Sequence, residues 1–293
     1  MSTHSPAPSA PTGATPTLVL VHGSGTSSFM WAPLQRELAL LGLRSYAVDL
    51  PGHGFDAQYP MSYQCPQDLD ALAGEPSTLS RVTLDDNVDA VLAVVRRLRE
   101  HGPVVLVGAS LGGVTIGAVA DRAPDLIDRL VYISAWVCTA AADPIEYMAE
   151  PEFATSLLPA LAGLNVGDPT VLGVGRANYR TADPDLLRTL KAATMADATD
   201  EQFMAFLNIM QPDESLAVMT ADARVGAGWS RVPRTFIRLT QDRSLPIAMQ
   251  DRLIRDADAL TPQNRFQVHT LDTTHAGFLY RSAEVAALLH RIS

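Results

Sequence analysis

The feature that most constrains the fold is a stretch in which strand-forming residues give way to helix-compatible residues across a single serine. Val104 to Val107 are four consecutive apolar residues, as in a buried strand. The motif Gly108-Ala-Ser110-Leu-Gly112 follows, and helix-compatible residues continue to Arg122. This order predicts a tight turn that lifts the hydroxyl of Ser110 out of a sheet.

The helix predicted after this turn favours a catalytic role for the serine. Its unpaired N–H groups and the positive end of its dipole point to the place where a tetrahedral oxyanion forms. We therefore predict that Ser110 is a nucleophile rather than a structural serine in a strand-to-helix loop.

Strand and helix patterns alternate along most of the chain. Apolar runs predict strands at 18–22, 44–49, 104–107, 130–134, 234–240 and 266–271. Periodic or capped patterns predict helices at 30–41, 83–100, 246–257 and 282–292. This alternation predicts an α/β fold with a doubly wound, mostly parallel sheet and right-handed crossovers.

Residues 135–232 interrupt the alternation with short helical patterns and no convincing strand. Phe203, Phe206, Leu207 and Met210 form the clearest amphipathic stripe. We expect a helical cap at 135–232 between two core segments, 18–134 and 233–293, with most stripe residues packing and some Met, Leu and Phe lining a pocket. A disordered leader is expected at 1–17, and no role is assigned to the irregular stretch at 55–80.

Composition and charge exclude several classes of function. No run of 18 apolar residues is present, so we expect a soluble protein without a membrane partner. Lys and Arg total 22 and Asp and Glu total 32, a net charge of −10 that disfavours nucleic acid. Cys65 and Cys138 lie in no metal or redox spacing, so a cytoplasmic protein without metal or other cofactor is expected. The sequence leaves open whether these cysteines pair and which oligomeric state the protein adopts.

A nucleophilic serine needs a base with a pKa near neutrality and a third group that orients the base. His275 is the strongest candidate for the base because it lies in a loop after the last predicted strand. The histidines set aside lie in the leader, near a helix end, within a strand and in the final helix: His4, His101, His269 and His290.

Asp242 is the strongest candidate for the acid because Thr240-Gln-Asp242 directly follows a predicted strand. Two other interpretations stay open: Arg243 could pair with Asp242, or Asp143, which follows an earlier strand, could be the acid. The predicted catalytic residues are therefore Ser110, Asp242 and His275, in that chain order.

The turn after the first strand, His22-Gly23-Ser24-Gly25, has two interpretations. Gly23-x-Gly25 with Asp49 further along imitates a dinucleotide-binding fingerprint, but Ser28 stands where the third glycine belongs. We favour an oxyanion hole formed by the backbone N–H groups of Ser24 and Leu111, with His22 ordering the loop.

Taken together, His22-Gly-Ser24, Asp49-Leu-Pro-Gly-His-Gly54, Gly108-Ala-Ser-Leu-Gly112, Thr240-Gln-Asp242 and Thr274-His275 resemble the α/β-hydrolase superfamily over residues 17–293. The helix pattern after Asp242 is similar to the small esterase and hydroxynitrile-lyase branch. In that branch, plant hydroxynitrile lyases carry a lysine just after the catalytic histidine and a threonine in the oxyanion turn. Ala276 and Gly23 occupy those places here, which argues against cyanohydrin cleavage.

The sequence favours a serine hydrolase that cleaves a carboxylic ester or related acyl substrate through an acyl-enzyme on Ser110. The expected partner is a small, mostly apolar molecule. Two alternatives keep the same fold: acyl transfer, cyclisation or lyase chemistry in a pocket that excludes water, and ligand binding with slow or no hydrolysis.

Overall fold

Six parallel strands form the central sheet of the computed structural model, which describes residues 15–293. The sheet order is β2-β1-β3-β4-β7-β8. The strands are β1 (Thr17–Val21), β2 (Arg44–Val48), β3 (Val104–Ser110), β4 (Arg129–Ala135), β7 (Arg234–Leu239) and β8 (Gln267–Leu271). The predicted α/β fold with a mostly parallel sheet is confirmed. Thr17 is already a buried strand residue, although the sequence placed it in the leader, and positions 1–14 of that predicted leader lie outside the described residues.

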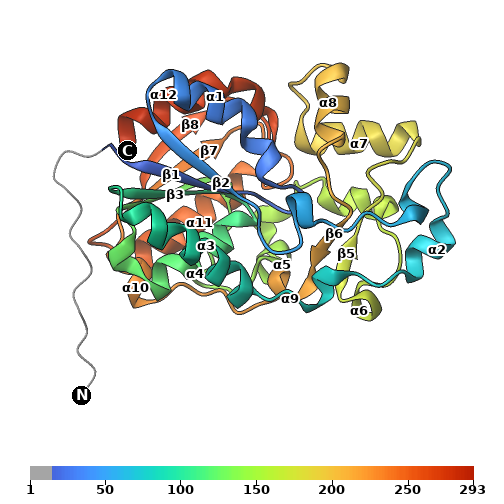
Figure 1. The fold of residues 1–293 in the computed structure, drawn as a ribbon, viewed down its shortest axis with the longest axis horizontal. Helices are drawn as coiled ribbons and strands as arrows, with labels where there is room; N and C mark the ends of the chain where they lie inside the picture. Colours follow the sequence, from blue (N-terminus) through green and yellow to red (C-terminus); the bar gives the residue numbers. More distant parts are fainter. Residues whose placement is uncertain (1–14) are drawn as a thin grey trace.

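Helices cover both faces of the sheet (Figure 1). One face carries α1 (Ala32–Leu40) and α12 (Ser282–Ile292), and the other carries α3 (Leu84–Arg99), α4 (Gly112–Arg122) and α11 (Ile247–Leu260). Side chains alternate across a strand, so β1 serves both layers. Its Leu18 and Leu20 join the cluster under α1 and α12, while Val19 and Val21 join the cluster on the α3 side.

The chain between β4 and β7, residues 136–233, is named here the insertion. It contains α5 (Pro144–Met148), α6 (Pro169–Leu172), α7 (Pro184–Thr194), α8 (Asp200–Leu207), α9 (Leu216–Met219) and α10 (Ala227–Arg231). It also contains a two-stranded antiparallel sheet of β5 (Val174–Arg176) and β6 (Asp213–Ser215), so the expectation of no strand was wrong. Three residues are too short a run to show the alternation that marks a strand in sequence.

The end of the insertion belongs with the sheet layers rather than with the other insertion helices. The carboxylate of Asp121 in α4 accepts hydrogen bonds from the backbone N–H groups of Gly226, Gly228 and Trp229 at 2.9–3.1 Å. Helix α10 therefore packs beside α4 (Figure 1), whereas the sequence placed it within the cap.

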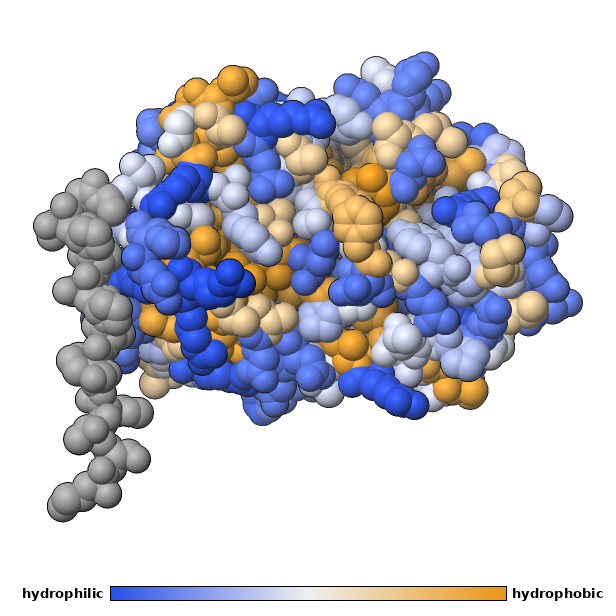
Figure 2. Space-filling model, in the orientation of Figure 1, coloured by the Kyte–Doolittle hydropathy of each residue, from blue (hydrophilic) through white to orange (hydrophobic). Residues whose placement is uncertain are grey.

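The stretch at 55–80 consists of short 3-10 turns and one α-helix, α2 (Leu69–Gly74). It carries the exposed hydrophobic side chains Phe55 and Met61. The visible face of the molecule is mostly hydrophilic with scattered hydrophobic side chains (Figure 2). Within residues 15–293, no helix combines the length and apolar character that crossing a bilayer requires.

Candidate active site

Ser110 lies at the turn between β3 and α4. Its φ is +51°, a left-handed conformation that is strained for a residue with a side chain. The turn is possible because Gly112 presses against the end of β1: a Cβ there would lie 2.5 Å from the carbonyl oxygen of His22. The structure thus places the Ser110 side chain in a cavity, as the Gly-x-Ser-x-Gly motif predicts.

Asp242 and His275 meet at the same edge of the sheet, past the carboxyl ends of β7 and β8. The Nδ1–H of His275 donates to Oδ2 of Asp242 at 2.6 Å. This bond fixes the tautomer that leaves Nε2 open to accept a proton. Burial alone lowers the pKa of His275, but the charge and hydrogen bond of Asp242 outweigh it and raise the pKa above its ordinary value.

The carboxylate of Asp242 is buried and fully used by hydrogen-bond donors. The backbone N–H groups of Ser244 and Leu245 donate to Oδ1 at 2.7 and 2.8 Å. The hydroxyl of Ser134, at the end of β4, donates to Oδ2 at 2.6 Å. Sequence reasoning missed Ser134, and only its place at the end of a neighbouring strand hinted at this contact.

The alternatives left open for the acid are not what the structure forms. Asp143 caps α5, where its Oδ1 accepts the N–H of Glu146 at 2.9 Å. Arg243 is exposed and makes no side-chain bond to Asp242 among the described residues. Asp242 is the carboxylate that reaches His275.

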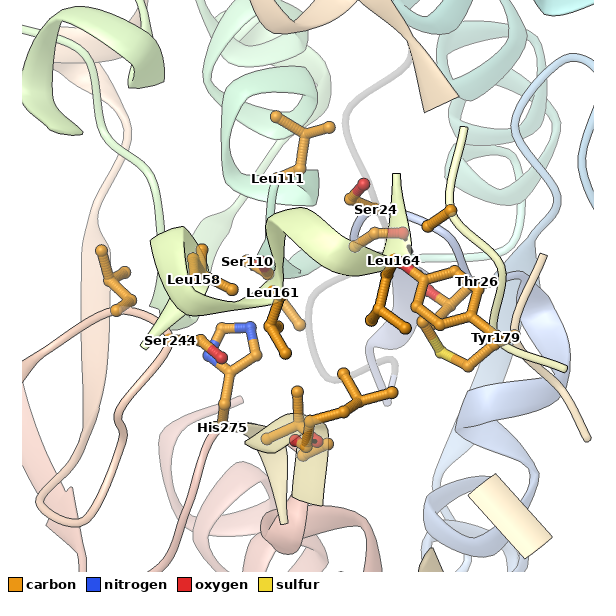
Figure 3. Close-up of a pocket in the computed structure, with 18 of the residues that line it drawn as sticks. Ser24, Thr26, Ser110, Leu111, Leu158, Leu161, Leu164, Tyr179, Ser244 and His275 are labelled. Atoms are coloured by element: carbon orange, nitrogen blue, oxygen red, sulfur yellow. Dashed lines mark hydrogen bonds between the residues drawn. The ribbon is translucent and has the colours of Figure 1, made fainter. Parts of the chain in front are cut away.

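Ser110 and His275 line one cavity (Figure 3). Within residues 15–293, the only hydrogen bond of the His275 ring is the one to Asp242, so the serine hydroxyl and Nε2 are not directly bonded. Catalytic hydrogen bonds commonly tighten only when substrate is bound. Ser110, Asp242 and His275 are therefore brought to one site, with the serine–histidine contact open.

The backbone N–H groups of Ser24 and Leu111 have no acceptor among the described residues, and both residues line the cavity beside Ser110 (Figure 3). Leu111 precedes the first turn of α4, where the helix dipole favours negative charge. These two donors stand free beside Ser110, and their role as an oxyanion hole stays a prediction.

His22 orders the turn after β1. Its Nδ1–H donates to the carbonyl of Gly23 at 2.9 Å, and its Nε2 accepts the N–H of Leu50 at 3.2 Å. Burial, followed by the nearby His53, lowers the pKa of His22 to about 4, so the ring is neutral at neutral pH. A neutral ring bonded on both nitrogens is a structural element of the loop.

The dinucleotide interpretation is not supported by the contacts of this turn. The N–H of Gly25, which a phosphate would need, donates to a carboxylate oxygen of Glu214 at 3.0 Å. Asp49, which would bind the ribose, accepts the N–H of Ser28 at 2.7 Å. Both groups are used inside the protein.

The cavity has a volume of about 410 Å³. Among the described residues that line it, none is Asp, Glu, Lys or Arg. The insertion supplies most of the lining, and the expectation that Met, Leu and Phe face a pocket is confirmed. The apolar lining includes Met30, Leu158, Leu161, Leu164, Phe206 and Met210.

Comparison with known proteins shows which family has this architecture. The model of the alpha/beta hydrolase family matches residues 18–288, nearly the whole described chain. The chain belongs to the alpha/beta hydrolase family. This alpha/beta hydrolase falls in the branch of esterases and lyases that the sequence motifs resemble.

Relatives support the same placement, and solved structures share the fold. Methylesterase 17 of Arabidopsis thaliana is 24% identical over 276 residues, 92% of this chain and 88% of that protein. The alpha-hydroxynitrile lyase of the same plant is 29% identical over 119 residues, 41% of this chain and 39% of that protein. The crystal structure of a pyrethroid hydrolase from Sphingobium faniae has a TM-score of 0.72 at 21% identity, covering 94% of this chain and 96% of that one, and shares the fold.

Proposed function

We propose that this alpha/beta hydrolase cleaves a carboxylic ester through an acyl-enzyme on Ser110. The observation that carries the proposal is the hydrogen bond of 2.6 Å between the buried Asp242 and His275, which lines the same cavity as the serine of a strained strand-to-helix turn. Esterases and hydrolases among the relatives support ester hydrolysis in general.

His275 acts first as a general base. Its Nε2 takes the proton of Ser110 as Oγ attacks the ester carbonyl, and Asp242 stabilises the imidazolium that forms. The same proton then passes to the leaving alcohol, which departs as the carbonyl re-forms. Water enters, loses a proton to His275 and attacks the carbonyl carbon of the acyl-enzyme. The bond from that carbon to Oγ then breaks, the acid is released, and His275 returns the proton to Oγ of Ser110.

The backbone N–H groups of Ser24 and Leu111 hold the oxyanion of both tetrahedral intermediates. They are amides fixed by the fold, so little reorganisation accompanies charge development. Removing one such donor costs roughly 10²–10³ in kcat in other serine enzymes.

The cavity favours a neutral, mostly apolar substrate. Its apolar walls come mainly from the insertion, and we propose that the part of the insertion before α10 acts as a cap that shapes the pocket. Two relatives, a methylesterase and a pyrethroid hydrolase, support the choice of an ester substrate.

The decisive experiment compares the wild type with Ser110→Ala. The wild type should react with a fluorophosphonate probe and hydrolyse neutral nitrophenyl esters of varied chain length, whereas S110A should keep its fold, lose labelling and lose kcat by roughly 10⁴-fold or more. Full esterase activity in S110A would refute the assignment. Labelling of Ser110 without release of acid from any ester would point to transfer or lyase chemistry on the same serine.

A further inference from the structure

A buried carboxylate from the insertion reaches the turn that carries one of the proposed oxyanion donors. The turn, residues 23–26, is named here the oxyanion turn. Oε2 of Glu214 in β6 accepts the N–H of Gly25 at 3.0 Å, across 189 residues of sequence. Oε1 of Glu214 accepts the N–H of Ser215 at 3.1 Å, which holds the side chain in place.

A second hydrogen bond from the insertion is made to the same glycine. The carbonyl oxygen of Gly25 accepts the N–H of Gln211 at 2.8 Å. Both polar backbone groups of Gly25 are therefore bonded to one short segment of the insertion. The orientation of the two peptide planes that flank Gly25 is fixed from outside the turn.

The preceding peptide, between Gly23 and Ser24, is fixed within the turn. Its carbonyl oxygen accepts the hydroxyl of Thr26 at 2.8 Å and the Nδ1–H of His22 at 2.9 Å. In a planar trans peptide the N–H points opposite to the C=O, so these bonds direct the N–H of Ser24. Thr26 is the next residue after Gly25, so its position depends on the hydrogen bonds that Glu214 and Gln211 make to Gly25.

A negative charge close to a developing oxyanion is unfavourable unless a positive charge balances it. His53 supplies that balance, because its Nε2 lies 3.6 Å from Oε2 of Glu214. Burial alone lowers the pKa of His53, but the nearby charge of Glu214 raises it overall. Burial alone raises the pKa of Glu214, but His53 and the Gly25 N–H lower it overall. The two pKa shifts run in opposite directions, and each favours the charged form of its group, so the charges of the pair offset one another.

We propose that Glu214 is a positioning residue that holds the oxyanion turn, so that the N–H of Ser24 is directed at the oxyanion. The inference rests on the proposed serine mechanism. Glu214 does not line the cavity, so it acts through the turn and not on the substrate. The insertion would thus contribute to the chemical step as well as to the shape of the pocket.

The test compares Glu214→Ala and Glu214→Gln with the wild type and with Glu201→Gln. Glu201 is an exposed carboxylate of α8 in the same insertion and serves as the control. For each protein, kcat and KM for a neutral nitrophenyl ester are measured per site titrated with a fluorophosphonate. The inhibition constant of a trifluoromethyl ketone, which forms an oxyanion-bearing adduct on serine, is measured in parallel.

Loss of the hydrogen bond between Glu214 and Gly25 should weaken binding of the transition state and leave substrate binding unchanged. E214A should lower kcat roughly 10- to 100-fold and raise the inhibition constant of the trifluoromethyl ketone by the same factor. Its KM should stay within about threefold of the wild-type value. E214Q retains an acceptor for the N–H of Gly25, so its kcat should fall less than about fivefold. E201Q should have the kcat of the wild type. If E214A does not fold, Glu214→Asp, whose shorter side chain falls short of Gly25, takes its place with the same expectation.

Two outcomes would overturn the inference. One is a purely structural effect, in which E214A lowers the melting temperature but the titrated sites keep wild-type kcat and inhibitor affinity. The other is a rise in KM at constant kcat, which would mean that Glu214 affects ground-state binding.

Hydrogen exchange separates this inference from the mechanism on which it rests. The amides of residues 22–27 should exchange faster in E214A than in the wild type, whether or not Ser110 is the nucleophile. Faster exchange in E214A, together with equal ester hydrolysis by the wild type and S110A, would refute the serine mechanism but not the positioning role of Glu214. Unchanged exchange in E214A, in an enzyme whose activity depends on Ser110, would refute the positioning role alone.

Discussion

At the scale of the residue, the site depends on how completely the carboxylate of Asp242 is held. Two backbone N–H groups and the hydroxyl of Ser134 bond to it in addition to His275. A buried carboxylate that accepts from four donors has little freedom to rotate. The imidazole is oriented by a partner that is itself fixed.

Asp242→Asn should therefore reduce kcat roughly 10³- to 10⁴-fold with little change in fold. An amide N–H group facing Nδ1 favours the tautomer with the proton on Nε2, which cannot take the proton of Ser110. The same change removes the charge that raises the pKa of His275 and leaves its burial, so that pKa should fall.

The pH profile of kcat/KM measures both effects. The base works when neutral, so activity is lost as pH falls through the pKa of His275. The midpoint of this acid limb should lie above the ordinary value of about 6.5 in the wild type and at lower pH in D242N. Asp143→Asn is the matched control, since Asn caps a helix as well as Asp and activity should be retained. A large loss of kcat in D143N would revive the alternative acid.

At the scale of the element, the first turn of α4 is packed unusually close to the sheet. A Cβ on Gly113 would lie 2.3 Å from the carbonyl oxygen of Trp136 and 2.9 Å from the Cβ of Ala135. The contact at Trp136 is with rigid backbone just past the end of β4. This closeness lets α4 start directly after Ser110 and bring the N–H of Leu111 into the site.

Gly113→Ala should lower the free energy of unfolding by about 1–3 kcal/mol, because the added methyl group overpacks this contact. Gly74→Ala provides the control: Gly74 ends α2, and a Cβ added there would meet no atom within 4 Å, so the change should be neutral or slightly stabilising. Urea unfolding measures both. A G113A protein as stable as the wild type would show that α4 can move away from β4 at no cost.

At the scale of the whole molecule, charge is kept out of the cavity and spread over the surface. The net charge is −10, yet no Asp, Glu, Lys or Arg is among the described residues that line the cavity. A charged group that entered would lose its hydration without gaining a counter-charge. Substrate selection by charge follows from the distribution of residues over the entire chain.

We expect an ester with a carboxylate on its acyl chain to react poorly. A nitrophenyl hemisuccinate should show a kcat/KM at least roughly 100-fold below that of the butyrate of the same alcohol, after subtraction of spontaneous hydrolysis. High salt screens the long-range repulsion by the acidic surface but not the loss of hydration inside the cavity. Discrimination that persists in about 1 M salt would locate its source in the cavity, and equal rates for the two esters would contradict the prediction.

Features that rest on local patterns could be predicted from the order of residues alone. Long apolar runs and periodic helices predicted the parallel α/β sheet. The Gly-x-Ser-x-Gly motif around Ser110 predicted the turn that exposes its side chain. The loops that follow the last two strands predicted Asp242 and His275, because the carboxyl ends of parallel strands share one edge.

Contacts between distant segments could not be predicted, because they form only when the folded elements pack together. Ser134 meets Asp242 across 108 residues, and Glu214 meets Gly25 across 189. A serine or glutamate carries no local mark of its partner, since these bonds exist only once the sheet and the insertion have packed. The three-residue strands β5 and β6 and the place of α10 beside α4 were likewise set by packing and not by periodicity.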